Sequence, residues 1–172
     1  ANSGIVVTVD QPDFHDYEKH GQLSALHFQA AVERQACLAA GATQAAPAQR
    51  LMDFLANKVS VSLNESSYQP GLTSADFNSV LPHDIVLALQ QGFKNFGAKM
   101  KGYLTNDAQI IGVESRTSSP VRIPRDPVTL EHPHVKRLYP CGEGAGYAGG
   151  IVSAAMDGER CAEAVAQIIT GR

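Results

Sequence analysis

Residues 142–150 combine the residue types in this chain that most favour ligand binding. They read Gly-Glu-Gly-Ala-Gly-Tyr-Ala-Gly-Gly, so five of the nine positions are glycine. Glycine accepts positive φ angles and lets a backbone approach a ligand closely. A helix is expected to begin at about Ala148 or Gly149, and the free N–H groups at a helix start favour anionic or electron-rich oxygens. This glycine-rich turn contains no lysine or arginine, so the N–H groups of Gly149, Gly150 and Ile151 would make any contact with an anion.

Residues 144–149 match the pattern Gly-x-Gly-x-x-Gly, which is typical of a Rossmann phosphate loop when it lies between a strand and a helix. The first strand–helix unit of that fold needs a second strand and an acidic residue about 20 positions later. The sequence instead finishes at Arg172, where the expected helix ends. We therefore expect the last strand–helix step of a fold rather than its first. A tight connection that binds no ligand is the alternative for the whole turn.

Other side chains near the turn each have two interpretations. Arg116 and Arg122 flank Thr-Ser-Ser-Pro, and paired arginines can bind a carboxylate substrate or a pyrophosphate; surface salt bridges are the alternative. Tyr147 either contacts a ligand or forms a wall of the turn. Cys141 has no Cys-x-x-Cys partner and no pattern brings Cys37 or Cys161 to it, so we expect a small buried side chain rather than a redox centre.

Composition and charge exclude several classes of function. The net charge is -3 and the basic residues are scattered, which excludes a nucleic-acid partner. No apolar run approaches the roughly 20 residues that cross a bilayer, so no membrane partner is expected. The N-terminus lacks the features of a signal peptide. The three cysteines are far apart and suggest no disulfide framework, so a cytoplasmic location is expected. His132 and His134 have no carboxylate or cysteine nearby to complete a metal site, so no metal is expected.

Hydrophobic periodicity predicts an α+β chain in two parts. Residues 1–105 are expected to form a mostly helical substrate or insertion region, and residues 106–172 a short-stranded segment with a long C-terminal helix. Residues 10–21 are polar and are expected to form a loop. Expected helices cover residues 23–39, 47–55, 75–80, 83–99 and 151–169, and expected strands cover residues 5–9, 109–114, 121–123 and 138–141.

Two apolar stripes are expected on helices, and the first of them is expected to face a core. The first lies on the helix of residues 83–99, and the second lies on one side of the last helix. The members of the first are Ile85, Val86, Leu89, Phe93 and Phe96, and those of the second are Ile151, Val152, Ala155, Ala162, Val165 and Ile169.

Two stretches of the sequence resemble a known family. They are Arg-Thr-Ser-Ser-Pro-Val-Arg-Ile at residues 116–123 and Leu-Tyr-Pro-Cys-Gly-Glu-Gly-Ala-Gly-Tyr-Ala-Gly-Gly-Ile at residues 138–151, with weaker matches at residues 1–7, 47–50 and 53–55. The chain is similar to the uncharacterised bacterial FAD-dependent dehydrogenases related to the HI0933-like flavoproteins. The resemblance covers nearly the whole chain, and the glycine segment is its most specific part. It implies a fragment with half a cofactor site, because the dinucleotide-binding loop of that family lies in an N-terminal portion that this sequence lacks.

The resemblance also implies roles for the residues of the turn. Many flavoproteins with two dinucleotide domains return to the FAD domain through a final strand, a Gly-Asp or Gly-Glu pair and a helix directed at the flavin. Gly142 and Glu143 fit that pair, and the carboxylate of Glu143 would accept a hydrogen bond from a ribityl hydroxyl. The helix start would stabilise negative charge at the N1–C2=O2 edge of the flavin. The expected FAD contacts are Gly142, Glu143, Gly144, Ala145, Gly146, Tyr147, Ala148, Gly149, Gly150 and Ile151.

The function implied by the resemblance is therefore that of a C-terminal fragment of an FAD-dependent oxidoreductase. Residues 106–172 would be the closing part of its FAD-binding domain. The substrate would be an unknown small molecule and NAD(P)H is a candidate partner, both bound with the help of the missing N-terminal part. No catalytic acid or base is assigned, and the fragment alone is expected to be inactive. Two alternatives remain: a non-catalytic binding or interaction domain, and a nucleotide-phosphate binder that uses the turn alone.

Overall fold

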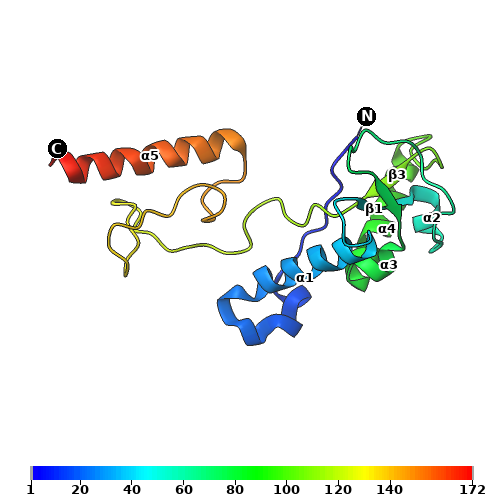
Figure 1. The fold of residues 1–172 in the computed structure, drawn as a ribbon, viewed down its shortest axis with the longest axis horizontal. Coiled ribbons are helices and arrows are strands. Elements are labelled where there is room, and N and C mark those ends of the chain that lie inside the picture. The colour runs from blue at the N-terminus through cyan, green and yellow to red at the C-terminus, as the bar shows by residue number, and fades with distance from the viewer. Residues whose placement is uncertain (1, 172) are drawn as a thin grey trace. The chain divides into compact units, whose positions relative to one another are not determined.

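The computed structural model describes residues 2–171 and has the predicted α+β class. The chain divides into two compact units (Figure 1). The first unit contains the residues up to His15 and Phe28–Ser115, and the second contains Asp16–His27 and the residues from Arg116 onward. The domain boundary near residue 105 remains a prediction. The structural elements, in chain order, are η1 (Gln11–Leu23, a 3-10 helix), α1 (Ser24–Ala39), β1 (Ala46–Arg50), α2 (Leu51–Leu55), β2 (Leu72–Ser74), α3 (Phe77–Val80), α4 (His83–Lys99), β3 (Gln109–Ile111) and α5 (Ile151–Thr170).

The first unit is built on a three-stranded sheet of order β2-β1-β3. β1 pairs in parallel with β2 and antiparallel with β3. The central strand contains Pro47, a residue that usually occurs only at sheet edges because it lacks an N–H group. The last β1–β3 pair joins Ala48 to Ile111, and beyond it the N–H of Gly112 still donates to the Pro47 carbonyl at 3.1 Å. The N–H group that Pro47 lacks is therefore missing at the end of the β1–β3 ladder.

The core of the first unit forms where α2, α3 and α4 pack together. The Phe54 ring is fully buried and meets Phe77 and Phe93 edge-on, with ring centroids 6.2 and 6.0 Å apart. Gln49 is also fully buried, and its amide is satisfied because it donates to the Lys58 carbonyl and accepts from the Phe77 N–H. The polar side chain thus ties the central strand to two connecting segments.

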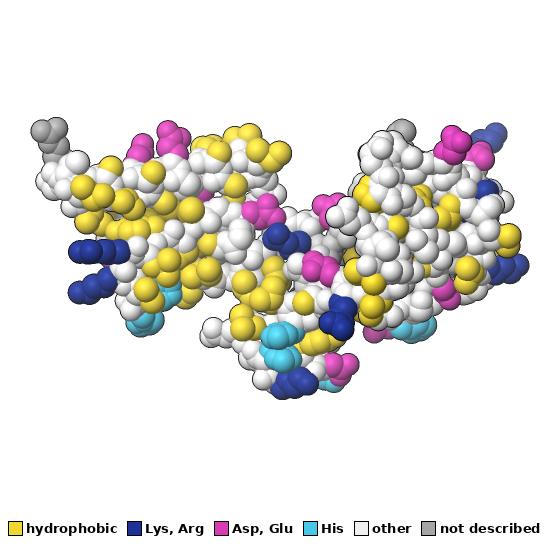
Figure 2. Space-filling view, viewed as in Figure 1, with side chains coloured by type: hydrophobic (Ala, Val, Ile, Leu, Met, Phe, Trp, Pro, Cys, Tyr) yellow, Lys and Arg dark blue, Asp and Glu magenta, His cyan; other side chains and the backbone are white. Residues whose placement is uncertain are grey.

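The second unit contains α5 and a long irregular segment, and its described residues include no strand. The side chains that α5 buries are those of Asp157 and Cys161. Five large apolar residues of α5 are exposed instead, and yellow side chains are visible along this helix in Figure 2. They are Ile151, Val152, Met156, Ile168 and Ile169, with Ile151 92% exposed.

Several predicted elements differ from the observed ones. Residues 5–9, 121–123 and 138–141 form no strand, and residues 10–21 are mostly 3-10 helix rather than loop. The helix expected from Pro47 begins only at Leu51, because residues 46–50 pair as β1. The apolar stripe of α5 lies mostly exposed within this chain. The stripe of α4 is confirmed, with Val86 and Phe93 buried.

Candidate functional site

The glycine-rich turn leads directly into α5, as the sequence predicts. Gly150 is the N-cap residue and has an extended backbone. Its N–H donates to the Ser153 hydroxyl at 3.1 Å, and that hydroxyl donates to the Gly150 carbonyl at 3.0 Å. The N–H of Gly150 is therefore already used, which differs from its expected role as an anion donor. The N–H groups of Ile151, Val152 and Ser153 lie in the first helical turn, where no helix carbonyl precedes them.

Two glycines of the turn are required by the fold itself. Gly142 has φ 70° and Gly146 has φ 83°, in the left-handed region that favours glycine. A Cβ atom at Gly146 would lie 2.8 Å from the Val121 carbonyl oxygen and 3.0 Å from the Arg122 Cα atom. The backbone there packs against residues 121–123, and the Ile123 N–H donates to the Ala145 carbonyl at 3.1 Å.

The other three glycines have no such explanation within the described chain. Gly144, Gly149 and Gly150 are exposed and lie outside the left-handed region. A Cβ atom at Gly144 would meet nothing within 4 Å, and one at Gly149 would only reach the Thr117 carbonyl oxygen at 4.0 Å. At Gly150 the nearest atom would be the Ser153 hydroxyl oxygen, at 3.7 Å. Their bare backbone therefore leaves open surface on one side of the turn.

A buried ion pair holds the turn against α5. Arg125 donates to both carboxylate oxygens of Asp157, at 2.6 and 2.9 Å, and the two side chains are only 6% and 7% exposed. Arg125 also donates to the Pro140 carbonyl at 2.8 Å, and Asp157 accepts from the Gly142 N–H at 2.9 Å. The guanidinium carbon of Arg125 lies 3.6 Å from the centre of the Tyr147 ring. One guanidinium thus joins the helix, the turn and the segment before it.

The same contacts set the acidity of the buried groups. The hydrogen bond from Arg125 lowers the pKa of Asp157 below its ordinary value, with a further contribution from the Gly142 N–H. Burial raises the pKa of the Cys161 thiol, and the nearby Cys141 acts in the same direction. The two cysteines are therefore neighbours, although no sequence pattern indicates it. Cys141 itself is exposed, which corrects the expectation of a buried side chain.

The structure gives the two arginines flanking Thr-Ser-Ser-Pro different partners. Arg116 forms an ion pair with Glu143 at 3.3 Å, and both side chains are about two-fifths exposed. Arg122 instead lies over the Tyr147 ring, with its guanidinium carbon 4.3 Å from the ring centre. The Tyr147 hydroxyl donates to the Ile123 carbonyl at 2.9 Å. Tyr147 is therefore a wall of the turn in this structure, and its role toward a ligand stays a prediction.

Sequence reasoning missed Arg125 and Asp157, which are 32 positions apart in the chain. Of these two residues, only Asp157 had a recognisable signal in the sequence. Asp157 is the lone acidic residue in an otherwise uncharged stretch of the last helix, residues 151–158. A buried acid needs a cationic partner, so such a residue indicates an arginine or lysine elsewhere in the fold. No pattern singles out Arg125 among the neighbouring basic residues.

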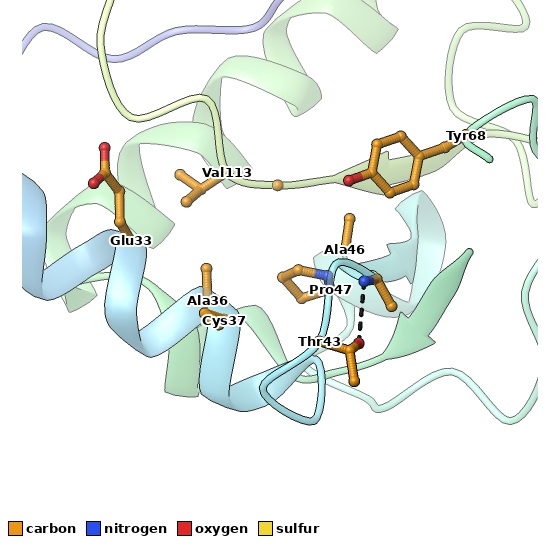
Figure 3. Close-up of a pocket in the computed structure, with 10 residues that line it drawn as sticks. Glu33, Ala36, Cys37, Thr43, Ala46, Pro47, Tyr68 and Val113 are labelled. Atoms are coloured by element: carbon orange, nitrogen blue, oxygen red, sulfur yellow. Dashed lines mark hydrogen bonds between the residues drawn. The ribbon is translucent and has the colours of Figure 1, made fainter. Parts of the chain in front are cut away.

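A separate small cavity lies in the first unit (Figure 3). It has a volume of about 180 Å³ and is lined by α1, by β1 with the residues before it, and by Tyr68 and the residues after β3. Glu33 is its one charged lining residue, and its carboxylate already accepts hydrogen bonds from Ser115 and Gln29. The remaining walls are small or apolar, apart from Thr43 and Tyr68. This cavity therefore offers no evident chemistry.

Metal and membrane sites can be assessed over residues 2–171. No group of three or more histidine, cysteine or acidic side chains is placed to hold a metal ion in this range. Nδ1 of His132 accepts from the N–H groups of His134 and Val135, each at 3.1 Å. None of the helices in the same range has the length and apolar character needed to cross a bilayer.

Comparison with known proteins identifies the family. Residues 1–117 match the model of a family described as "FAD-dependent protein, C-terminal domain-like". This chain belongs to that family. The matched range ends two residues after Ser115, where the first unit also ends, so the family match does not include the glycine-rich turn.

A relative of this FAD-dependent C-terminal domain extends the similarity to the second unit. A protein of Clostridium beijerinckii, named only as an uncharacterised protein, is 44% identical over 165 residues. The alignment includes 95% of this chain, and so reaches well beyond residue 117. The chain spans only 30% of the length of that relative.

Proposed function

We propose that the glycine-rich turn and the start of α5 contact FAD in a longer flavoprotein. The proposal depends chiefly on Gly144, Gly149 and Gly150. Neither their backbone angles nor their packing requires glycine, and the surface that they leave bare adjoins the first turn of a 20-residue helix. Membership of an FAD-dependent family supplies a candidate ligand, and a bare backbone allows such a ligand to approach closely. A further part of the proposal is that the longer protein is a dehydrogenase related to the HI0933-like flavoproteins.

The residues of the turn fit such a ligand. The N–H groups of Ile151, Val152 and Ser153 would face the electron-rich edge of the flavin, where helix-start dipoles favour negative charge. Glu143 would accept a hydrogen bond from a ribityl hydroxyl. Its present partner Arg116 is no obstacle, because an ion pair this exposed contributes only about 0–1 kcal/mol.

The chain's own contribution to catalysis would be positioning. FAD, when bound, supplies the transfer of hydride or electrons. Arg125 and Asp157 hold Gly142 and Tyr147 against α5, so the open side of the turn keeps one shape. Exclusion of water from that side would strengthen the effect of the helix-start dipoles. No residue of the turn is assigned as a general acid or base.

The substitutions Gly149→Val and Gly150→Val test the flavin contact. In a longer protein that carries this sequence, each should reduce the ratio of bound flavin to protein at least about tenfold, because a branched side chain would occupy the open side. The flavin absorbance of the purified protein measures the ratio, and circular dichroism checks the fold. Gly4→Val is the matched control, since a Cβ atom at Gly4 would meet no atom within 4 Å and Gly4 lies outside the turn.

Two results would contradict this proposal. Unchanged flavin content in both turn variants would make the turn purely structural. Thermal stabilisation of the unmodified protein by ADP but not by FAD would favour the nucleotide-phosphate alternative instead. The dehydrogenase part is tested separately by adding NADH or NADPH without oxygen. Bleaching of the flavin absorbance supports it, and a flavin that neither coenzyme reduces counts against NAD(P)H as the electron donor.

A further inference from the structure

A second pocket lies in the second unit, and several of its lining residues are positively charged. It has a volume of about 490 Å³ and lies between residues 122–130, Tyr147 of the glycine-rich turn and Arg160 of α5. Three of its lining residues are arginines, namely Arg122, Arg125 and Arg160. Such a concentration of guanidinium groups in one cavity is costly unless negative charge compensates it.

The protein compensates one of these three charges. Arg125 is paired with the buried carboxylate of Asp157. Arg122 and Arg160 are exposed, and neither forms an ion pair within the part of the chain that the structure describes. The acid nearest to Arg122 in sequence, Asp126, uses Oδ1 to accept from the N–H groups of Val128 and Thr129. The charge of Arg160 helps to lower the pKa of Asp157, but the hydrogen bonds of that carboxylate go to Arg125 and the Gly142 N–H. Two guanidinium groups are thus left to bind an external anion.

The remaining walls are rigid and largely apolar. Pro124, Pro127 and Leu130 line the pocket, and Leu130 is buried. The Tyr147 ring is fixed at its hydroxyl by the Ile123 carbonyl and contacts the guanidinium groups of Arg122 and Arg125. Stacking on an aromatic ring holds a guanidinium in a fixed plane and leaves its N–H edge available for a planar acceptor. The pocket is therefore lined by guanidinium groups together with apolar and aromatic side chains.

We propose that this pocket binds the phosphate or carboxylate group of a small molecule, with Arg122 and Arg160 as the anion-binding residues. Guanidinium groups bind both anions through two parallel N–H···O bonds, which a lysine cannot match. The prolines, Leu130 and Tyr147 would contact the apolar or aromatic body that carries the anion. None of the open glycines Gly144, Gly149 and Gly150 lines this pocket, so the site does not depend on the proposed flavin contact.

Calorimetric titration of the 172-residue chain at physiological salt tests the site. The probes are inorganic pyrophosphate and benzoate, which represent the two anion classes. Saturable binding of at least one probe is expected, with Arg122→Gln and Arg160→Gln each weakening it about tenfold or more, as for loss of a charged hydrogen bond. Tighter pyrophosphate binding identifies a phosphate-bearing ligand such as a nucleotide, and tighter benzoate binding identifies a carboxylate substrate.

The control is Arg34→Gln, which removes one exposed arginine from α1 in the first unit. It should leave the affinity of the probe unchanged. Equal weakening by Arg34→Gln would show a diffuse charge effect and overturn the proposal. Absence of binding of both probes up to about 10 mM would overturn it as well. Thermal unfolding of each variant verifies that the exposed substitutions leave the fold intact.

Discussion

Asp157 is the single residue on which the arrangement of the turn depends most. Its carboxylate faces Arg125 and the Gly142 N–H in a setting nearly closed to solvent. Removal of one partner from a buried ion pair typically costs about 3–5 kcal/mol, because the other charge stays buried. Asp157→Asn should therefore lower the free energy of unfolding of the second unit by about 3 kcal/mol, measured by denaturant titration. Glu143→Gln, which breaks an exposed pair, should cost less than about 1 kcal/mol.

The stabilisation from the Arg125–Asp157 ion pair should depend on pH, because the pKa of Asp157 is shifted in the folded protein. The folded protein holds this pKa below the ordinary value, while unfolding restores it to about 4. The unfolded chain thus binds more protons in acid, so the stabilisation is complete above about pH 4 and is lost as the pH falls through the folded pKa. Between about pH 5 and pH 2 the wild-type protein should lose more stability than Asp157→Asn does. Parallel curves for the two proteins would contradict this role of the ion pair.

The residues of the site were only partly predictable. The glycine density of residues 142–150 is a local signal, and the structure shows that at least two of these glycines serve the backbone itself. The contact between Arg125 and Asp157 joins distant positions, so no spacing rule reveals it. The same is true of Cys141 and Cys161, which become neighbours only because the turn folds back along α5.

At the scale of elements, prediction succeeded where a periodic pattern also finds a packing surface. α4 follows its apolar stripe from His83 to Lys99, as predicted. Residues 5–9 are rich in β-branched residues but form no strand, because strand propensity has an effect only when a partner strand supplies hydrogen bonds. Residues 46–50 become a strand despite Pro47, since β2 and β3 lie on either side of them. Tertiary pairing overrides local preference at both places.

A side-chain cap at the start of α3 is a further feature at the scale of elements. Thr73 and Ser74 lie in β2, and Asp76 caps the helix by accepting from the Asn78 N–H at 3.0 Å. Asp76→Ala should lower the unfolding free energy of the first unit by about 1 kcal/mol, measured in urea. Glu65→Ala, at an exposed position in the loop before β2, is the control. An equal effect of the two substitutions would refute a capping role.

At the scale of the whole molecule, the comparison with the Clostridium beijerinckii relative matters most, because the chain spans 30% of its length. If the remaining part of such a protein supplies the other half of a flavin site, the 172-residue chain should retain little FAD when purified alone. The longer relative should then carry FAD close to one per protein, as released flavin measured by fluorescence would show. A short chain with full flavin content would refute the idea of a divided site.

α5 is a complete helix in the structure although its apolar side is not covered. Its anchor is polar, through Asp157, so the helix does not need its exposed isoleucines to hold it in place. Fixing the backbone of a residue costs roughly 1–2 kcal/mol of conformational entropy, and here that cost falls on folding rather than on association. A surface that covered Ile151 and Ile169 would therefore meet an already ordered helix, and less conformational entropy would be lost on association.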